Sequence, residues 1–143
     1  MARAAELAPS LVDAILHPPA RPLAVRGHSG CGKTRLIRRV VQEIGIQSTW
    51  ATAFDLTATM TDAVREGRYD LYRAGFTTDR RPLCIEHLED LRGKPVTRKE
   101  VRRLLQARAT SGCPTLLTIT TNSRGDGEVL EWLAPWTELC SLE

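Results

Sequence analysis

A glycine-rich segment of eight residues constrains this chain more than any other part of its sequence. Residues 27–34 read Gly-His-Ser-Gly-Cys-Gly-Lys-Thr, which is a glycine, four arbitrary residues, then Gly-Lys and a hydroxyl residue. The segment follows a short apolar run at residues 23–25 and precedes a pattern typical of an amphipathic helix. A strand, a glycine-rich turn and a helix in this order are the context in which this motif, the Walker A pattern, forms a phosphate-binding loop.

The predicted loop has the groups that hold a nucleoside triphosphate, which we take to be ATP with Mg²⁺. Glycines let the backbone turn so that successive N–H groups point at phosphate oxygens, and the N-terminal end of the next helix adds partial positive charge. We expect Lys33 to reach the β- and γ-phosphates and the Thr34 hydroxyl to bind Mg²⁺. The residues expected to bind the nucleotide are Gly27, His28, Ser29, Gly30, Cys31, Gly32, Lys33 and Thr34. A turn that binds nothing is the alternative, but the flanking strand and helix patterns favour the loop.

A second apolar run supplies the acid that a triphosphate site needs for its metal. Residues 82–85 predict a buried strand, and Glu86 follows it directly. An acid at the end of a second strand holds the metal in such sites, so we expect Glu86 to bind Mg²⁺ through water. A surface carboxylate at a strand end is the alternative, because the usual residue in this role is the shorter Asp.

Short apolar runs alternate with helical patterns along the whole chain, without an internal repeat. Strands are expected at residues 23–25, 48–52, 82–85, 115–119 and 138–142. Helices are expected at residues 9–17, after the loop, from Asp55 as a cap, from a capping box of Thr97 and Glu100, and at residues 128–133. This alternation predicts an α/β fold with a mostly parallel sheet.

Length and composition exclude several classes of protein. The 143 residues, 42% of them hydrophobic, are enough for one compact domain spanning the whole chain but not for two. No run approaches the ~20 apolar residues that cross a bilayer, and the N-terminus lacks a secretory signal, so we expect a soluble cytoplasmic protein. The four cysteines are far apart and expected to be reduced. Two spacings, His28-x-x-Cys31 and Cys84-x-x-His87, are weak indications of zinc, and each is better explained by the element in which it lies.

Positive charge is concentrated in one segment, although the net charge is only +3. The basic residues between positions 92 and 108 are Arg92, Lys94, Arg98, Lys99, Arg102, Arg103 and Arg108, against the single acid Glu100. A solvated helix face is the favoured interpretation, and weak contact with single-stranded nucleic acid is the alternative. The run contains no aromatic residue on which bases could stack.

The order of these parts resembles the nucleotide-binding domain of the DnaA family of bacterial replication initiators, which are AAA+ ATPases. The resemblance covers residues 22–44 and 55–122, and it rests above all on Leu-Cys-Ile-Glu-His-Leu-Glu-Asp-Leu-Arg-Gly-Lys at residues 83–94. It implies a P-loop NTPase sandwich of three layers, with a five-stranded parallel sheet between helices and a sensor strand beside the phosphate loop. By position, Asn122 resembles the first sensor, a polar side chain that responds to the γ-phosphate, with Thr121 as the alternative.

The departures from that family bear on hydrolysis. His87 stands where the family has the second acid, which orients the attacking water, and an imidazole can act as a base without being an assured replacement. Residues 128–136, near which the family supplies an arginine finger, contain no basic residue. The family's helical lid and DNA-binding domain would follow Glu143 and are expected to be absent. Weak or no ATP hydrolysis is therefore expected.

Three classes of function remain open at this point. The first is an ATP-binding, DnaA-like module linked to replication initiation or its regulation, with weak or no hydrolysis. The second is an active ATPase or small phosphotransferase, and the third is a protein-interaction module with a vestigial site. Trp132 and Trp136 are expected to lie exposed and to mark a surface for a protein partner. The guanine signature Asn-Lys-x-Asp is missing, which favours ATP over GTP.

Overall fold

Five parallel strands form the centre of the computed structural model, which describes residues 3–122 and 127–142. The strands are β1 (Leu23–Gly27), β2 (Thr49–Thr52), β3 (Leu83–Glu86), β4 (Thr115–Thr120) and β5 (Glu138–Ser141). They pair in the order β2-β3-β4-β1-β5, and every pair is parallel. The predicted parallel sheet is confirmed, with the predicted sensor strand β4 beside β1.

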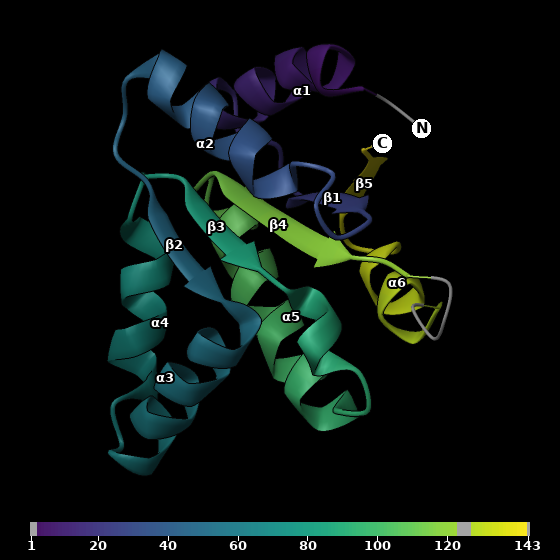
Figure 1. Cartoon of the computed structure of the whole chain (residues 1–143). Helices are drawn as coiled ribbons and strands as arrows, with labels where there is room; N and C mark the ends of the chain where they lie inside the picture. The colour runs from purple at the N-terminus through teal and green to yellow at the C-terminus, as the bar shows by residue number, and fades with distance from the viewer. Residues whose placement is uncertain (1–2, 123–126, 143) are drawn as a thin grey trace.

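Helices cover both faces of this sheet (Figure 1). They are α1 (Ala4–Leu16), α2 (Lys33–Ile44), α3 (Ala53–Arg65), α4 (Tyr69–Thr78), the 3₁₀ helix η1 (Leu88–Leu91), α5 (Pro95–Thr110) and α6 (Gly127–Leu133). Helices α1 and α2 lie on one face, and α3 to α6 lie on the other. The predicted three-layer α/β sandwich is therefore confirmed. In the described ranges, no helix is long and apolar enough to cross a membrane.

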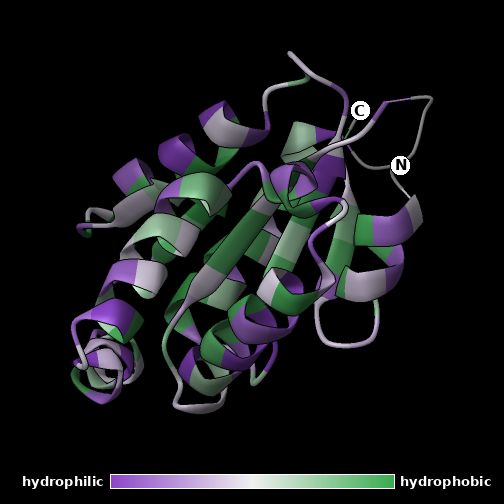
Figure 2. Ribbon diagram, turned by 90° about the horizontal axis from the view of Figure 1, so that it is seen from below, coloured by the Kyte–Doolittle hydropathy of each residue, from purple (hydrophilic) through white to green (hydrophobic). Residues whose placement is uncertain are grey.

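Two apolar clusters hold the layers together. On one face, Leu11 of α1 and Ile37 of α2 are fully buried in a cluster that includes Val25. On the other face, Leu104 of α5 packs in a cluster that includes Ala24. Neighbouring residues of β1 thus enter different clusters, which is why the strand is apolar at successive positions. The strands are largely green in Figure 2, whereas the helices carry both colours because one side of each faces water.

The first helix is longer than the sequence predicted. It begins at Ala4, and Pro9, the expected start, lies inside it. Leu7 and Leu11 are both buried one turn apart, so the apolar stripe crosses the proline. Burial of this stripe outweighs the loss of one backbone donor at an exposed position.

Two predicted helix caps were wrong. The cap of α3 is Thr52, whose Oγ1 accepts a hydrogen bond of 3.1 Å from the backbone N–H of Asp55. Helix α5 begins at Pro95, so Thr97 and Glu100 lie within the helix and form no capping box. Proline suits the first position because the N–H that it lacks would have no helical partner there.

Helix α4 was not predicted from the sequence, although Tyr69, Tyr72 and Phe76 lie on one side of it and pack against the core. None of the residues Tyr69–Thr78 is fully buried. Tyr72 and Phe76 are half-buried against the core cluster that includes Leu104 of α5. The Tyr72 hydroxyl and Thr59 of α3 share a hydrogen bond of 2.8 Å. The C-terminal end of α4 is held by the Arg108 side chain of α5, which donates to the carbonyls of Phe76 and Asp79 at 2.8 and 2.9 Å. Contacts from other segments therefore fix this helix.

The tryptophan pair of α6 and the following turn was wrongly expected to lie exposed. Trp136 is 1% exposed and belongs to the same core cluster as Leu104 of α5, while Trp132 is half-buried against that cluster. The two rings lie 5.1 Å apart with an interplanar angle of 63°. Because α6 packs against this side of the sheet, the two rings stabilise the core. A protein partner near them stays a prediction.

Candidate functional site

The predicted site residues gather at the edge of the sheet where its parallel strands end. Neighbouring strands β3, β4 and β1 end in Glu86, Thr120 and Gly27 respectively. Gly27 is in register with Thr120, and the Thr121 N–H donates to the Gly27 carbonyl at 2.9 Å. Ligands of open α/β sheets bind outside this edge, in the crevice at the carboxyl ends of the strands.

The loop needs its glycines for two different reasons. Gly30 and Gly32 have φ of 80° and 95°, in the left-handed region that other residues rarely adopt. At Gly27 the reason is space, because a Cβ there would lie 2.6 Å from Cys31 Sγ and 2.9 Å from the Leu142 carbonyl oxygen. The backbone can therefore follow this path, and come close to a ligand, only with glycine at these positions.

The lysine of the motif is held inside the curve of the loop. Lys33 is 7% exposed, and its Nζ donates to the carbonyls of Gly27 and His28, each at 3.0 Å. Cys31 Sγ lies 3.8 Å from the same Nζ. His28 and Ser29 are exposed. The ammonium group thus lies within the loop, where a phosphate oxygen would meet it.

The threonine of the motif contacts the predicted metal-binding acid. The Thr34 hydroxyl, in the first turn of α2, donates a hydrogen bond to Oε1 of Glu86 at the end of β3. Both residues are half-buried. Cys84 lies two residues before Glu86 in β3, and burial is the main cause that raises the pKa of its thiol to about 12. Cys84 is therefore a buried thiol of the strand interior.

A hydroxyl and a carboxylate in contact are oxygen ligands of the kind that Mg²⁺ prefers. In residues 3–122 and 127–142, no group of three or more His, Cys, Asp or Glu side chains could hold a metal ion. All four cysteines are free. A cation at this edge would therefore need Thr34, Glu86, water and the phosphates of a ligand together, which fits Mg²⁺ bound with a nucleotide.

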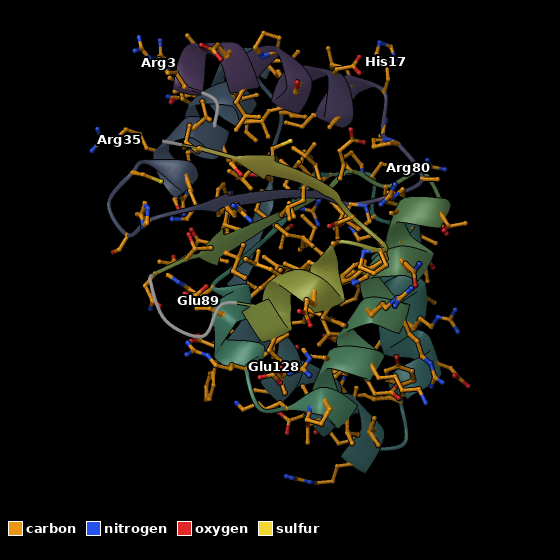
Figure 3. The ribbon with its side chains drawn as sticks, turned by 90° about the vertical axis from the view of Figure 1, so that its right-hand side faces the viewer. Arg3, His17, Arg35, Arg80, Glu89 and Glu128 are labelled. Carbon is orange, nitrogen blue, oxygen red and sulfur yellow. The ribbon has the colours of Figure 1, made fainter. Side chains whose placement is uncertain are left out.

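His87 lies directly after Glu86 and has an unusual backbone. Its φ is 62°, and it is the one non-glycine residue with positive φ in the part of the chain that the structure describes. Its Nδ1 lies 3.1 Å from Oε2 of Glu89, and the other oxygen of Glu89 accepts the Thr120 N–H at 3.0 Å. Figure 3 places Glu89 on the face of the sheet opposite α1. Sequence reasoning missed Glu89; its only signal was an acid two residues after the histidine.

The sensor candidates follow β4. Thr121 continues the pairing beside the loop, and Asn122 is exposed one residue further on. Arg124, which precedes the stretch where the DnaA family has an arginine finger, lies outside the described residues. Asn122 therefore lies near the loop, one residue beyond Thr121.

The basic segment is not the continuous solvated face that was favoured. Arg108 is 2% exposed, and burial is the main cause that lowers the pKa of its guanidinium. Arg98, with 12% of its side chain exposed, donates to Glu128 Oε1 at 2.5 Å and to the Leu91 carbonyl at 2.9 Å. Its hydrogen bond is the largest cause that lowers the pKa of Glu128. The favoured interpretation was wrong for these two arginines because each holds other segments together, while Arg92, Lys94, Lys99 and Arg103 remain exposed.

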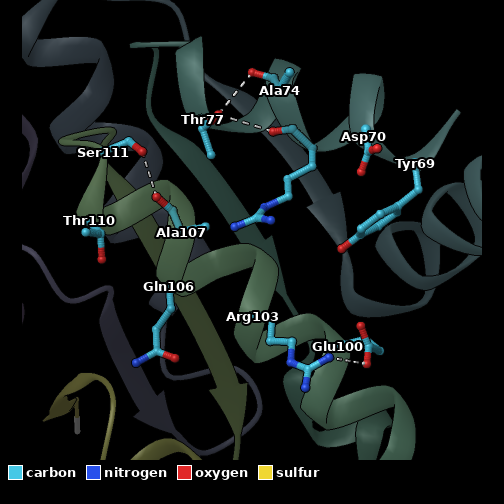
Figure 4. Close-up of a pocket in the computed structure, with 11 residues that line it drawn as sticks. Tyr69, Asp70, Ala74, Thr77, Glu100, Arg103, Gln106, Ala107, Thr110 and Ser111 are labelled. Carbon is cyan, nitrogen blue, oxygen red and sulfur yellow. Dashed lines mark hydrogen bonds and ion pairs between the residues drawn. The ribbon is translucent and has the colours of Figure 1, made fainter.

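A separate groove of about 910 Å³ lies between α4 and α5 (Figure 4). Its lining includes Tyr69 and Asp70 of α4 and Arg103 of α5, which forms an ion pair of 3.2 Å with Glu100. None of its lining residues belongs to the phosphate loop. The groove is thus distinct from the candidate nucleotide site.

Comparison with solved structures finds the same fold in replication proteins. A replication initiator DnaA bound to AMPPCP and single-stranded DNA has a TM-score of 0.71 at 18% identity, over 100% of this chain and 47% of that one. Domain III of the Thermotoga maritima DnaA has a TM-score of 0.70 at 19% identity, over 97% of this chain and 62% of that one. The DnaC helicase loader has a TM-score of 0.65 at 15% identity, over 94% of this chain and 86% of that one.

These similarities establish the fold. The predicted resemblance to the DnaA nucleotide-binding domain is confirmed at that level: the chain has the AAA+ type of P-loop NTPase fold. It spans 47% of the DNA-bound DnaA chain and 62% of the domain III chain. No family model matches the sequence, and no curated protein matches it.

Proposed function

We propose that this chain binds ATP with Mg²⁺ and acts, with weak or no hydrolysis, as a nucleotide-binding module in the initiation of DNA replication or its regulation. The observation that carries the proposal is the contact of Thr34 with Glu86. It joins the phosphate-loop motif to a carboxylate from a different strand, as a metal–triphosphate site requires.

The binding roles follow from the positions of the groups. The loop N–H groups and Lys33 hold the phosphates, and Thr34 with Glu86 holds Mg²⁺, which neutralises phosphate charge when bound. Asn122 is proposed as the residue that responds to the γ-phosphate. Replication initiator DnaA binds the ATP analogue AMPPCP in the same fold, which supports this choice of ligand.

Weak hydrolysis follows from what surrounds the γ-phosphate position. His87 replaces the acid expected there, and residues 128–136 contain no Lys or Arg to neutralise developing charge. An arginine finger alone contributes ~10³ to 10⁵ in rate. An active ATPase with a turnover near ~1 s⁻¹ is the alternative that a rate measurement would reveal.

The place in replication is proposed from the fold of the neighbours. Single-stranded DNA is bound by a DnaA of this fold, and exposed cations on α5 support a weak contact of the same kind here. A role like that of a helicase loader is the second candidate, because the DnaC helicase loader has the same fold, with a TM-score of 0.65 over 94% of this chain.

Isothermal titration calorimetry with ATP, ADP and GTP, each with and without Mg²⁺, tests the binding. ATP with Mg²⁺ should bind tightest, and Lys33→Ala should weaken it at least tenfold, about 1.4 kcal/mol. The matched control is Lys99→Ala, which removes one exposed lysine from α5 and should leave the affinity unchanged. Equal affinities in parent and Lys33→Ala, with equal melting temperatures, would mean that the loop is not the site.

A further inference from the structure

One carboxylate connects the two strand ends that flank the candidate γ-phosphate position. Glu89 Oε2 lies 3.1 Å from His87 Nδ1, just after β3, and Glu89 Oε1 accepts the Thr120 N–H at 3.0 Å, at the end of β4. The Glu89 side chain is 18% exposed and the His87 side chain 52%. The acid is thus fixed between two partners, while the ring remains open to water.

These contacts determine which ring nitrogen carries the proton. A carboxylate accepts hydrogen bonds and donates none, so Nδ1 of His87 must be the donor to Glu89. In a neutral imidazole one nitrogen is a donor and the other an acceptor. Nε2 of His87 is then unprotonated and accepts hydrogen bonds on the solvent side.

We propose that Glu89 is a positioning residue that sets the tautomer of His87, so that Nε2 accepts a hydrogen bond from the water that attacks the γ-phosphate. This inference rests on the proposed binding of ATP at the loop. A carboxylate at this position would accept from water in either orientation, whereas a histidine does so only in one tautomer. The replacement of an acid by His87 therefore needs a second residue such as Glu89.

The backbone of His87 agrees with a positioned side chain. A φ of 62° lies in the left-handed region, which is unfavourable for a non-glycine residue, and such strain concentrates at functional sites. The strained residue comes one position after Glu86, which already contacts the loop. The turn thus directs the Glu86 side chain to Thr34 of the loop and the His87 side chain to Glu89.

Hydrolysis by this route consumes only ATP and one water molecule. The water oxygen bonds to the γ-phosphorus as the bond from that phosphorus to the β–γ bridging oxygen breaks, and ADP leaves with the electron pair. The water proton passes to Nε2 of His87, where Glu89 stabilises the charged ring, and then to solvent. The products are ADP, phosphate and one proton.

Nuclear magnetic resonance of ¹⁵N-histidine protein tests the tautomer directly, without nucleotide and near pH 8. The ring nitrogens of His87 are assigned by their loss in His87→Asn. We expect Nδ1 protonated and Nε2 unprotonated in the parent and in the control Asp90→Asn, an exposed neighbour in η1. In Glu89→Gln, the amide oxygen keeps the Thr120 N–H and the NH₂ group faces the ring, so the proton should move to Nε2. A parent with its proton on Nε2 overturns the proposal.

Single-turnover hydrolysis with protein in excess over ATP tests whether Glu89 increases the rate of hydrolysis through His87. The parent should exceed the Lys33→Ala background, and Glu89→Gln should lower the rate at least tenfold while the ATP dissociation constant stays within twofold. In a His87→Glu background, Glu89→Gln should have less than a twofold effect, because no tautomer is left to set. A parent that binds ATP but turns over no faster than Lys33→Ala overturns this inference and leaves the proposed function intact. Failure to bind ATP overturns both.

Discussion

The Thr34 hydroxyl donates a hydrogen bond to the Glu86 carboxylate, although the two residues lie 52 positions apart in the sequence. Thr34 belongs to the first turn of α2, and Glu86 ends β3. β4 separates β3 from β1, which leads into the loop, so the contact spans three strands of the sheet edge. Two oxygen groups that could share one cation are therefore already together.

This contact predicts a specific loss of the Mg²⁺ effect in Glu86→Gln. The affinity for ATP with Mg²⁺ should fall about tenfold, or ~1.4 kcal/mol, because an amide oxygen is a weaker ligand than a carboxylate. The affinity for ATP without Mg²⁺ should change less than twofold. Calorimetry measures both, with Asp90→Asn as the control for loss of one negative charge. An equal loss with and without Mg²⁺ would show that Glu86 acts through the loop itself.

Replacing glycine by alanine should lower the stability of the fold at Gly27 and raise it at Gly75. Gly27→Ala places a methyl group against the Leu142 carbonyl and should destabilise the fold by about 1–3 kcal/mol. Gly75→Ala, inside α4 with no heavy atom within 4 Å of the new carbon, should stabilise it by about 0.5–1 kcal/mol. Urea unfolding measures both. A neutral Gly27→Ala would contradict the close approach of the loop to the end of β5.

Arg108 should be a stability residue and not a nucleic-acid contact. Its side chain donates to four carbonyls, those of Phe76, Asp79, Arg81 and Pro114. Arg108→Met leaves these acceptors without the donor and should cost about 2–4 kcal/mol in urea unfolding. The control Arg103→Met removes an exposed ion pair and should stay within about 0.5 kcal/mol. Equal effects of the two substitutions would refute the structural role.

Binding of single-stranded DNA should be weak and sensitive to salt. The cations Arg92, Lys94, Lys99 and Arg103 are exposed, and residues 92–108 contain no aromatic residue on which bases could stack. Anisotropy with a labelled oligonucleotide should show association at low salt that disappears near about 0.2 M, because phosphate contacts release counterions. Lys94→Glu with Lys99→Glu should abolish it, and sequence-specific binding that persists at 0.2 M would contradict this expectation.

The sequence by itself determined the features that depend on short segments. The phosphate loop is contiguous, its glycines fix the backbone path, and its context is local, so the pattern at residues 27–34 predicted both loop and flanking elements. The central strands β1, β3 and β4 were recognised because burial on both faces makes them apolar at successive positions. The ends of β3 and β4 located Glu86, His87 and Asn122. The parallel sheet followed from the alternation of strands and helices.

Only the tertiary structure decided how distant polar groups are used. Arg108 and Trp136 were expected at the surface, yet they are buried because carbonyls from other segments or the packing of α6 surround them. Helix α4 places Tyr69, Tyr72 and Phe76 half-buried against the core, and hydrogen bonds from α3 and α5 hold it there. The pairing of Glu89 with both His87 and Thr120 requires that η1 lie against the end of β4. The spacing of apolar residues along the sequence indicates which side of a helix or strand is buried. Hydrogen bonds between elements depend instead on distances that only the folded chain creates.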